Sequence, residues 1–575
     1  MTIKTESAGL SRRMFVRLAV GVVGASPVLV GACAPSLPRA SVGGTTTAPA
    51  PATGTGGTGS VYPTYIPTQN GPKPDYASDG LLYEDGYDNY PKNPQKSWLK
   101  DPPGAGSTVT AVSPGLYPPS HPLDQNPAWQ AVNKALNASV SFNIVPQQDY
   151  VQRLATIMAG NDLPDLLNMT AGINGAAGAA QFLEAQAADL TPYLAGDAVK
   201  NYPNLAALPT FAWKNAGCAY QGKLYMIPIE RYAPGTFFFK NDNIYDTEIG
   251  GNVVPKSSDD FKKILTELNK PDQDRWATAT YGGMGYDVVA WSQIFGGPNN
   301  WRLEANGNLT KNFETAEMRA TTGYLRDLVA AGLFHPNSLN YNLNSRRADF
   351  VAGRMAILPE GFGNPWNDFW GRGLKENPPI NFHPLPPFPA QEGGKPVHYL
   401  SVGFQSATAL KKASADRIQE LLRIVDYLAA PFGSAEDLLL IAGIPGVDYS
   451  LDANGNPQPI GDNLNLDANY VNWKYIVQHP QVMYLATIPG YAKAEYDAEH
   501  LAIPYGIPDP SLGFFSPTLN TKNVTLNQAF LDGITDVVLG RRPLADYDQL
   551  VTDWQNNGGN QIKSELSQSY AQLKG

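Results

Sequence analysis

Several features that mark other protein classes are scarce or missing in this sequence of 575 residues. Charged residues make up only 16% of the chain, below the ~25% usual for globular proteins. The net charge is −10 and no basic run occurs, so we expect no nucleic-acid partner. The sequence has no internal repeat, which argues against an adhesin or a structural surface protein.

Motifs of common hydrolases and of P-loop nucleotide-binding enzymes are also missing. The sequence contains no H-E-x-x-H, no G-x-S-x-G and no phosphate-binding P-loop, and its six histidines are scattered without metal-ligand spacing. We therefore expect neither serine nor metal catalysis, no bound metal and no cofactor.

The first 32 residues have the features of an export signal. Arg12 and Arg13 precede an apolar stretch over residues 18–31, which is shorter than the ~20 residues that a spanning helix needs. Together they resemble a twin-arginine signal, an address for the export of folded proteins. Residues 30–33, Val-Gly-Ala-Cys, resemble a bacterial lipobox. They predict a mature chain that begins at Cys33 and is held on the outer face of the cell membrane by a lipid. The alternative is an ordinary cleavage site with a coincidental cysteine.

A tether follows this signal. Residues 33–60 consist almost wholly of Ala, Pro, Gly, Ser, Thr and Val, a composition that does not bury enough apolar surface to fold. The sequence holds only two cysteines. If Cys33 carries lipid, Cys218 has no disulfide partner, and we expect it to be a buried free thiol.

The remaining chain of about 510 residues is too long for one compact core, so we expect at least two lobes. Short apolar runs over residues 109–112, 140–145 and 163–167 predict strands, and helical spacing over 151–158 predicts a helix. Strand, helix and strand in this order are typical of a parallel α/β sheet.

The middle of the chain repeats this alternation. Serine caps and first-turn acids predict a helix that begins near residue 257. Further helices are expected over 314–331 and 416–430, and residues 350–358 read as a helix end that turns into a strand. Two α/β units joined by more than one crossing predict a two-lobed α/β protein with a cleft.

Five segments, in this order, are similar to segments of one protein family: Met158–Leu166, Gln221–Pro228, Phe238–Asp242, Gly443–Tyr449 and Ile534–Leu544. The family comprises the extracellular solute-binding proteins (family 1) of bacterial carbohydrate ABC transporters, distant relatives of maltose-binding protein. The resemblance implies a periplasmic-binding-protein type II fold with a central cleft. We assign residues 61–232 and 397–450 to the first lobe, and residues 233–396 and 451–575 to the second.

The resemblance also implies a function. It indicates a monomer, not an enzyme, that captures a saccharide and delivers it to the permease subunits of an ABC transporter. Some family members carry a calcium loop after the helix that contains Phe261, but residues 270–275 here are too short for that loop and lack its glycine.

A saccharide site needs aromatic faces for C–H groups and polar side chains for hydroxyls, placed on loops that follow strands. Three segments meet this condition, and they supply the candidates Glu230, Arg231, Tyr232, Tyr286, Trp291, Glu360 and Trp366. Trp366 is the strongest stacking candidate, and Trp301 and Tyr449 are weaker. For Glu230 and Arg231 the alternative is an ion pair at a hinge, and for Trp291 it is burial in a core. Because Arg231 is positively charged, uronic acids remain possible ligands.

Two questions stay open at this point. Glu230 and Glu360 are also the carboxylates that a secreted glycoside hydrolase or polysaccharide lyase would place on either side of a sugar bond. Residues 61–100 contain six tyrosines and Trp98. This tyrosine-rich arm is expected either to wrap one lobe or to line the cleft.

Overall fold

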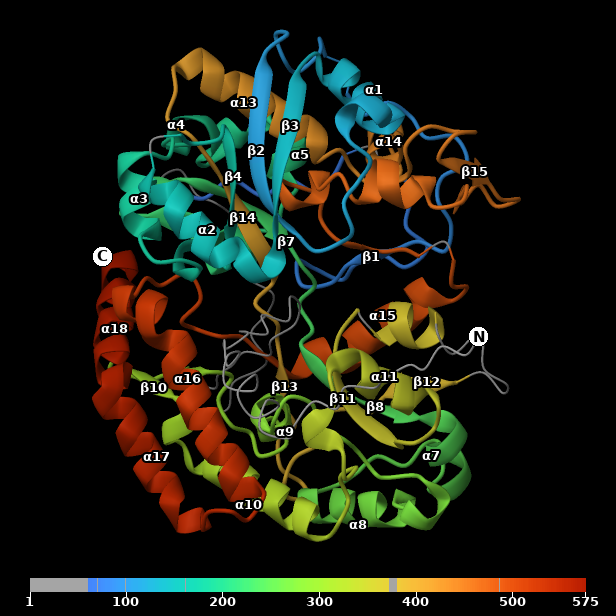
Figure 1. Cartoon of the computed structure of the whole chain (residues 1–575), viewed down its shortest axis with the longest axis vertical. Coiled ribbons are helices and arrows are strands. Elements are labelled where there is room, and N and C mark those ends of the chain that lie inside the picture. Colours follow the sequence, from blue (N-terminus) through green and yellow to red (C-terminus); the bar gives the residue numbers. More distant parts are fainter. Residues whose placement is uncertain are drawn as a thin grey trace, which may run out of the picture.

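The computed structural model describes residues 60–69, 71–98, 100–160, 162–363, 365–371, 380–485 and 487–574. The export signal, Cys33 and nearly all of the tether lie outside the described residues. The chain forms two lobes, which lie one above the other in Figure 1. Within the described part of the chain, no helix combines the length and the apolar character needed to cross a membrane.

The first lobe is built on a five-stranded sheet. Its strands run in the order β3 (Ser139–Pro146), β2 (Thr108–Gly115), β4 (Leu166–Thr170), β14 (Phe404–Leu410) and β7 (Met226–Glu230). β2 pairs in parallel with β3 and β4, and α2 (Gln147–Ala159) connects β3 to β4. The predicted parallel strand–helix–strand unit is therefore confirmed. β14 adds antiparallel pairing to β4 and β7.

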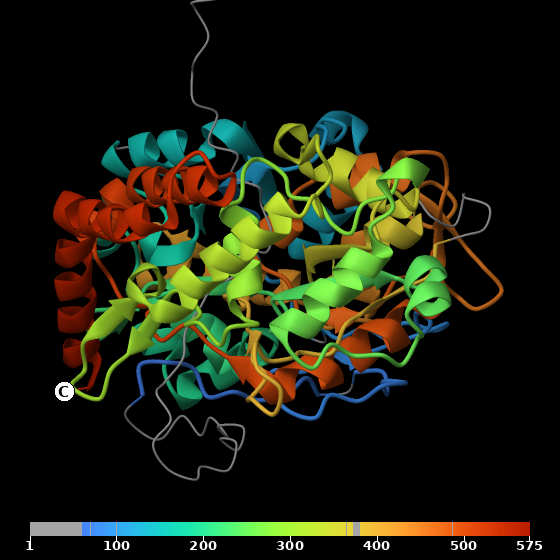
Figure 2. The same ribbon diagram turned by 90° about the horizontal axis from the view of Figure 1, so that it is seen from below.

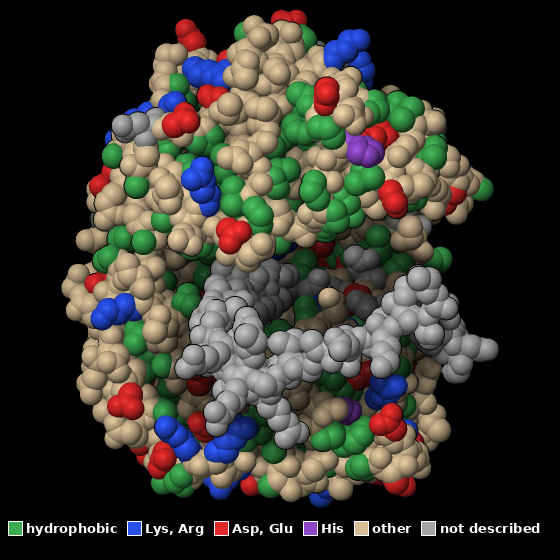
Figure 3. Space-filling view, in the orientation of Figure 1, with side chains coloured by type: hydrophobic (Ala, Val, Ile, Leu, Met, Phe, Trp, Pro, Cys, Tyr) green, Lys and Arg blue, Asp and Glu red, His purple; other side chains and the backbone are tan. Residues whose placement is uncertain are grey.

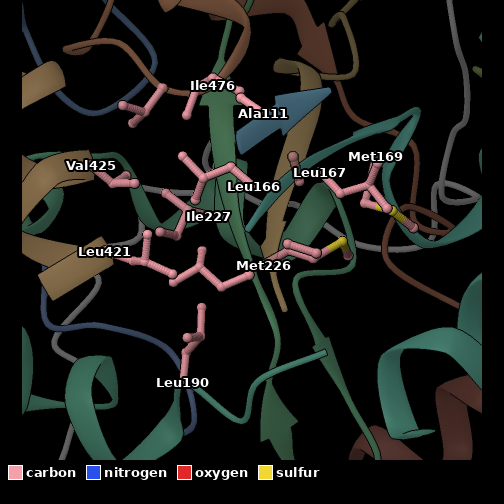
Figure 4. Close-up of a cluster of buried hydrophobic side chains, with 14 of the residues drawn as sticks. Ala111, Leu166, Leu167, Met169, Leu190, Met226, Ile227, Leu421, Val425 and Ile476 are labelled. Carbon is pink, nitrogen blue, oxygen red and sulfur yellow. The ribbon is translucent and has the colours of Figure 1, made fainter. Parts of the chain in front are cut away.

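The core of the first lobe lies between this sheet and its covering helices. Leu166 and Ile227 from the sheet meet Leu421 and Val425 of α13 (Ala415–Leu428), as Figure 4 shows. Further helices of this lobe are α1 (Pro127–Leu136), α3 (Ala179–Ala185), α4 (Thr191–Leu194), α5 (Pro203–Ala206), α6 (Thr210–Asn215) and α14 (Ala435–Ala442).

The segment after β15 (Tyr449–Leu451) also packs in the first lobe. Trp473 lies edge-on to Phe142, with ring centroids 5.0 Å apart. Ile476 is fully buried in the same core, and Figure 4 shows it near Ala111. The assignment of every residue from 451 onward to the second lobe is therefore corrected: the chain contributes to the first lobe at least as far as residue 477, because these apolar side chains complete its core.

The second lobe contains a smaller, antiparallel sheet. β8 (Thr236–Asn241) lies between β11 (Ile357–Gly361) and β12 (Phe382–Pro384). Its helices are α7 (Asp242–Glu248), α8 (Ser258–Leu268), α9 (Gly285–Ser292), α10 (Ala316–Ala330), α11 (Leu343–Val351), α15 (Tyr491–Ala502), α16 (Pro517–Val538), α17 (Tyr547–Trp554) and α18 (Asn560–Lys574). The predicted serine cap is confirmed, since Ser257 Oγ accepts the Asp260 N–H at 3.1 Å. The C-terminal helices, red in Figures 1 and 2, gather along one side of the molecule.

Two of the crossings between the lobes are extended and run side by side. Residues 231–235 lead from β7 to β8, and the chain returns through β13 (His398–Tyr399) to β14. Pro234 and Leu400 form an isolated antiparallel bridge between the two crossings. A side chain on Gly235 would place its Cβ 2.2 Å from Tyr399 O. Glycine at this position therefore lets the crossings approach each other.

The tyrosine-rich arm contacts both the first lobe and α15. Its strand β1 (Asp85–Gly86) pairs with β17 (Val482–Met483), and Tyr90 is buried with its OH 2.9 Å from Asp437 Oδ2. Tyr83 lies against His500 of α15, with ring centroids 4.7 Å apart. The arm therefore extends over the junction of the lobes.

Candidate functional site

Three of the predicted site residues lie at the end of β7 and at the start of the first crossing, which leads to β8. Glu230 ends β7 and is buried, with Oε2 accepting the Gln481 N–H at 2.7 Å. Burial raises the pKa of Glu230 to about 7, although this N–H and the Arg231 cation oppose the shift. Tyr232 packs against Phe362 of the second lobe, with ring centroids 5.1 Å apart. The crossing therefore places charged and aromatic groups between the lobes. Figure 3 shows that the surface is hollowed at the junction of the two lobes.

Arg231 forms part of the first-lobe wall. Its Nη1 donates to Glu230 O at 2.7 Å, and its Nη2 donates to Gln405 Oε1 on β14. Both acceptors are uncharged. The guanidinium is thus fixed in position by β7 and β14, while its positive charge is not cancelled by an ion pair with a described carboxylate.

Beside Arg231 lies an aromatic pair that the sequence analysis did not identify. Tyr117 stacks on Tyr470 with ring centroids 5.1 Å apart and planes 10° apart, and it is 46% exposed. Lys474 Nζ lies 4.5 Å from the centroid of Tyr117. The Lys474 cation lowers the pKa of Tyr117 despite partial burial, and Tyr475 and Arg231 act in the same direction. The wall therefore combines aromatic surface with two cations.

The sequence holds a signal for only part of this wall. Tyr117 comes two residues after β2, so the rule that placed candidates directly after strands also applies to it. Tyr470 and Lys474 follow no predicted strand, and only the fold brings them to Tyr117, more than 350 positions earlier in the chain.

In the second-lobe wall, the tyrosines Tyr281 and Tyr286 lie against the buried pair Arg346 and Glu360. Arg346, from α11, is fully buried, with its guanidinium carbon 4.3 Å from the ring centroid of Tyr281 and 5.4 Å from that of Tyr286. Tyr286 OH lies 3.2 Å from Thr236 Oγ1 at the start of β8. Within the described residues, Arg346 Nε and Nη1 have no hydrogen-bond partner.

Glu360 is held in place by arginines. Its Oε2 accepts from Arg346 Nη2 at 3.3 Å and from Arg347 Nε at 3.0 Å, and its Oε1 accepts the Gly361 N–H at 3.0 Å. Burial alone would raise its pKa, but the two arginines outweigh that effect and hold the pKa of Glu360 below its usual range. Both oxygens are engaged, so this carboxylate orients the arginines and is poorly placed to attack or deprotonate a substrate.

The structure corrects the expectation for the two tryptophans. Trp366 is 1% exposed, and its ring centroid lies 5.2 Å from that of Phe239. It begins a π-helical turn (Trp366–Trp370) that directs it into the core beneath the sheet. Trp291 is fully buried against Phe238, with centroids 5.0 Å apart. The weaker candidates Trp301 and Tyr449 are also buried. None of the four offers a ring face to a ligand.

The loop in which some family members bind calcium has a different organisation here. Lys270 Nζ and Arg275 Nη2 each lie 2.6 Å from an oxygen of Glu248. Two cations therefore occupy the neighbourhood of that carboxylate. Over the described ranges, no group of three or more His, Cys, Asp or Glu side chains is arranged to hold a metal ion.

Comparisons with known proteins agree with this architecture. The profile of a family described as bacterial extracellular solute-binding protein matches residues 121–431. The chain is 23% identical over 509 residues to Lipoprotein LipO of Bacillus subtilis, covering 82% of this chain and 94% of that protein. It is 21% identical over 479 residues to the polygalacturonan/rhamnogalacturonan-binding protein YtcQ of the same species, covering 80% of this chain and 90% of that protein.

Solved structures share the fold. An HMO-binding, ABC-transporter-associated solute-binding protein from Bifidobacterium longum infantis superposes with a TM-score of 0.60 at 13% identity, over 82% of this chain and 99% of that one. The alginate-binding protein AlgQ2 gives a TM-score of 0.57 at 15% identity, over 83% and 100% of the two chains. The two-lobed α/β fold predicted from the sequence is confirmed.

Proposed function

From the premise that this chain belongs to the bacterial extracellular solute-binding protein family, we propose that it captures a saccharide between its lobes and delivers it to the permease subunits of an ABC transporter. The observation that carries the proposal is the meeting of two walls at the β7–β8 crossing. Tyr117, Tyr470 and Arg231 come from one wall, and Tyr281 and Tyr286 from the other, where the buried Glu360 binds the Arg346 that lies against both rings. Aromatic faces beside fixed polar groups match the C–H faces and hydroxyls of a sugar.

Similar proteins support a saccharide as the ligand. The names of two of them specify polygalacturonan or rhamnogalacturonan and alginate, and a further structure is of FusA from S. pneumoniae in complex with kestose. The ligands are carbohydrates in all three cases, although the sugars differ. We extend the carbohydrate class, and none of these particular sugars, to this chain.

The lobes close by a hinge motion in this proposal. The paired crossings at Pro234 and Leu400 provide two adjacent extended segments that bend together. A saccharide that contacts both walls stabilises the closed form and shifts a pre-existing equilibrium towards it. Small-angle scattering should therefore show a smaller radius of gyration when the ligand is added.

Export and anchoring complete the proposal. The twin-arginine signal directs the folded chain out of the cytoplasm, and a lipid on Cys33 retains it, as a monomer, on the outer face of the membrane. The tether keeps the binding lobes near the permease and raises their effective concentration there. Mass spectrometry of the mature N-terminus tests the anchor, and a Cys33 without diacylglyceryl would contradict it.

A binding protein releases its saccharide unchanged, whereas a glycoside hydrolase or polysaccharide lyase cleaves it, so this difference distinguishes the proposed function from the alternative. Tyr117→Ala should weaken saccharide binding about tenfold or more, because the loss of an aromatic contact of ~1.5 kcal/mol corresponds to that factor. Tyr193→Ala is the matched control, since Tyr193 lies on α4, away from the crossing in Figure 1. Equal affinities of the two variants, or release of cleaved sugar, would contradict the proposal.

A further inference from the structure

We propose that the saccharide carries a carboxylate, as a uronic acid residue does, and that Lys474 and Arg231 of the first-lobe wall receive it. This inference rests on the proposed function and narrows its ligand class. Three observations carry it: neither side chain is paired with a described carboxylate, both lie near the aromatic pair of Tyr117 and Tyr470, and the carboxyls within electrostatic range of Arg231 are buried.

The two cations lie within electrostatic range of each other, and no described carboxylate forms an ion pair with either. Neither Arg231 nor Lys474 forms an ion pair with a carboxylate among the described residues, and the Arg231 donors bind the neutral oxygens of Glu230 and Gln405. Burial lowers the pKa of Lys474, and the Arg231 cation lowers it further while Tyr117 opposes the shift. Two like charges that are partly removed from water destabilise each other, and a bound anion relieves that cost.

The acids within electrostatic range of Arg231 do not provide this compensation. Glu230 is close enough to Arg231 for the cation to influence its pKa, yet its Oε2 is engaged by the Gln481 N–H and burial raises its pKa to about 7. Glu84 is also within electrostatic range of Arg231, and burial raises its pKa well above the usual value. Burial therefore disfavours the negative charge of both carboxyls, so neither offsets the positive charge of the wall well.

The aromatic pair locates the anion relative to a sugar ring. Tyr117 is 46% exposed, and its ring, stacked on Tyr470, has the Lys474 ammonium 4.5 Å from its centroid. A pyranose ring that packs against Tyr117 would bring a carboxylate substituent near this ammonium. A neutral sugar would gain the aromatic contact and leave both cations without an anion.

The local charge is opposite to that of the whole chain. The protein carries a formal net charge of −10, so long-range electrostatics disfavour an anionic ligand. Recognition of a carboxylate therefore depends on a few local cations, and the removal of one of them should have a measurable effect.

The test compares matched ligands on matched variants by titration calorimetry. The probes are short uronic-acid oligosaccharides, the same oligosaccharides after reduction of their carboxyl groups, and neutral oligosaccharides. Lys474→Met removes one cation, Lys474→Arg restores it, and Lys134→Met changes an exposed lysine on α1, away from the lobe junction in Figure 1. Circular dichroism and melting temperature establish that each variant is folded.

We expect wild type to prefer the acidic probe, and Lys474→Met to lose about 10-fold to 100-fold in affinity for it, the range for a charge-assisted hydrogen bond. Affinity for the carboxyl-reduced probe should be unchanged, and Lys474→Arg should recover most of the loss. Equal or tighter binding of the reduced or neutral probes by wild type would overturn this inference and leave saccharide capture standing. Binding of no probe in any class would overturn the proposed function as well.

Discussion

Replacement of Trp366 by alanine distinguishes a structural role of this side chain from a role in stacking on a ligand. The side chain is 1% exposed, and its ring contacts Phe239, Phe362 and Phe382 at centroid distances of 5.2, 5.4 and 6.2 Å. Phe239 lies on β8, Phe362 directly follows β11, and Phe382 lies on β12. Trp366 therefore fills the space beneath all three strands of the second sheet. A truncation to alanine in such a position costs about 3–5 kcal/mol.

The assay is denaturant unfolding followed by circular dichroism, with saccharide binding measured on the same preparations. Trp366→Ala should lower the free energy of unfolding of the second lobe by that amount. Trp370→Ala is the control on the same turn. Trp370 is only partly buried, so its replacement should lower the free energy of unfolding by less. A loss below about 1 kcal/mol together with much weaker sugar binding would refute the assignment of Trp366 to the core.

Two further predictions concern buried ionisable groups. Burial raises the pKa of Glu495 from 4.5 to about 8, so the folded state holds its proton more tightly than the unfolded state, and stability falls as pH rises from about 5 to 8. Glu495→Gln should reduce this dependence of stability on pH and stabilise the protein at pH 8, by about 1.4 kcal/mol per pKa unit removed. Denaturant unfolding at several pH values checks this prediction. An unchanged dependence of the free energy of unfolding on pH would contradict it. Cys218 is fully buried, and burial raises its thiol pKa, so a maleimide should label it only after unfolding; rapid labelling of the native protein would show that the thiol is accessible.

Local patterns predicted local structure well. The apolar runs at 109–112 and 140–145 lie in β2 and β3, and the helix expected over 416–430 is α13. Strand spacing and serine caps act within a few residues, so the sequence carries them directly. The family inferred from five ordered segments is confirmed by the profile match over residues 121–431.

The site was harder to predict because it forms from distant parts of the chain. Placement after a strand identified Glu360, but it also selected Trp366, because the sequence does not reveal that the turn after β11 directs this ring into the core. The aromatic pair of Tyr117 and Tyr470 depends on the return of residues 449–477 to the first lobe. That return also explains why the lobe boundary expected near residue 450 was placed too early.

Calorimetric titration of the wild-type protein with a panel of acidic and neutral oligosaccharides, followed by chromatography of the recovered sugar, tests the central claim most directly. The account predicts that at least one saccharide binds with one-to-one stoichiometry and is recovered intact. Failure of every saccharide to bind, or recovery of the bound sugar in cleaved form, would contradict it.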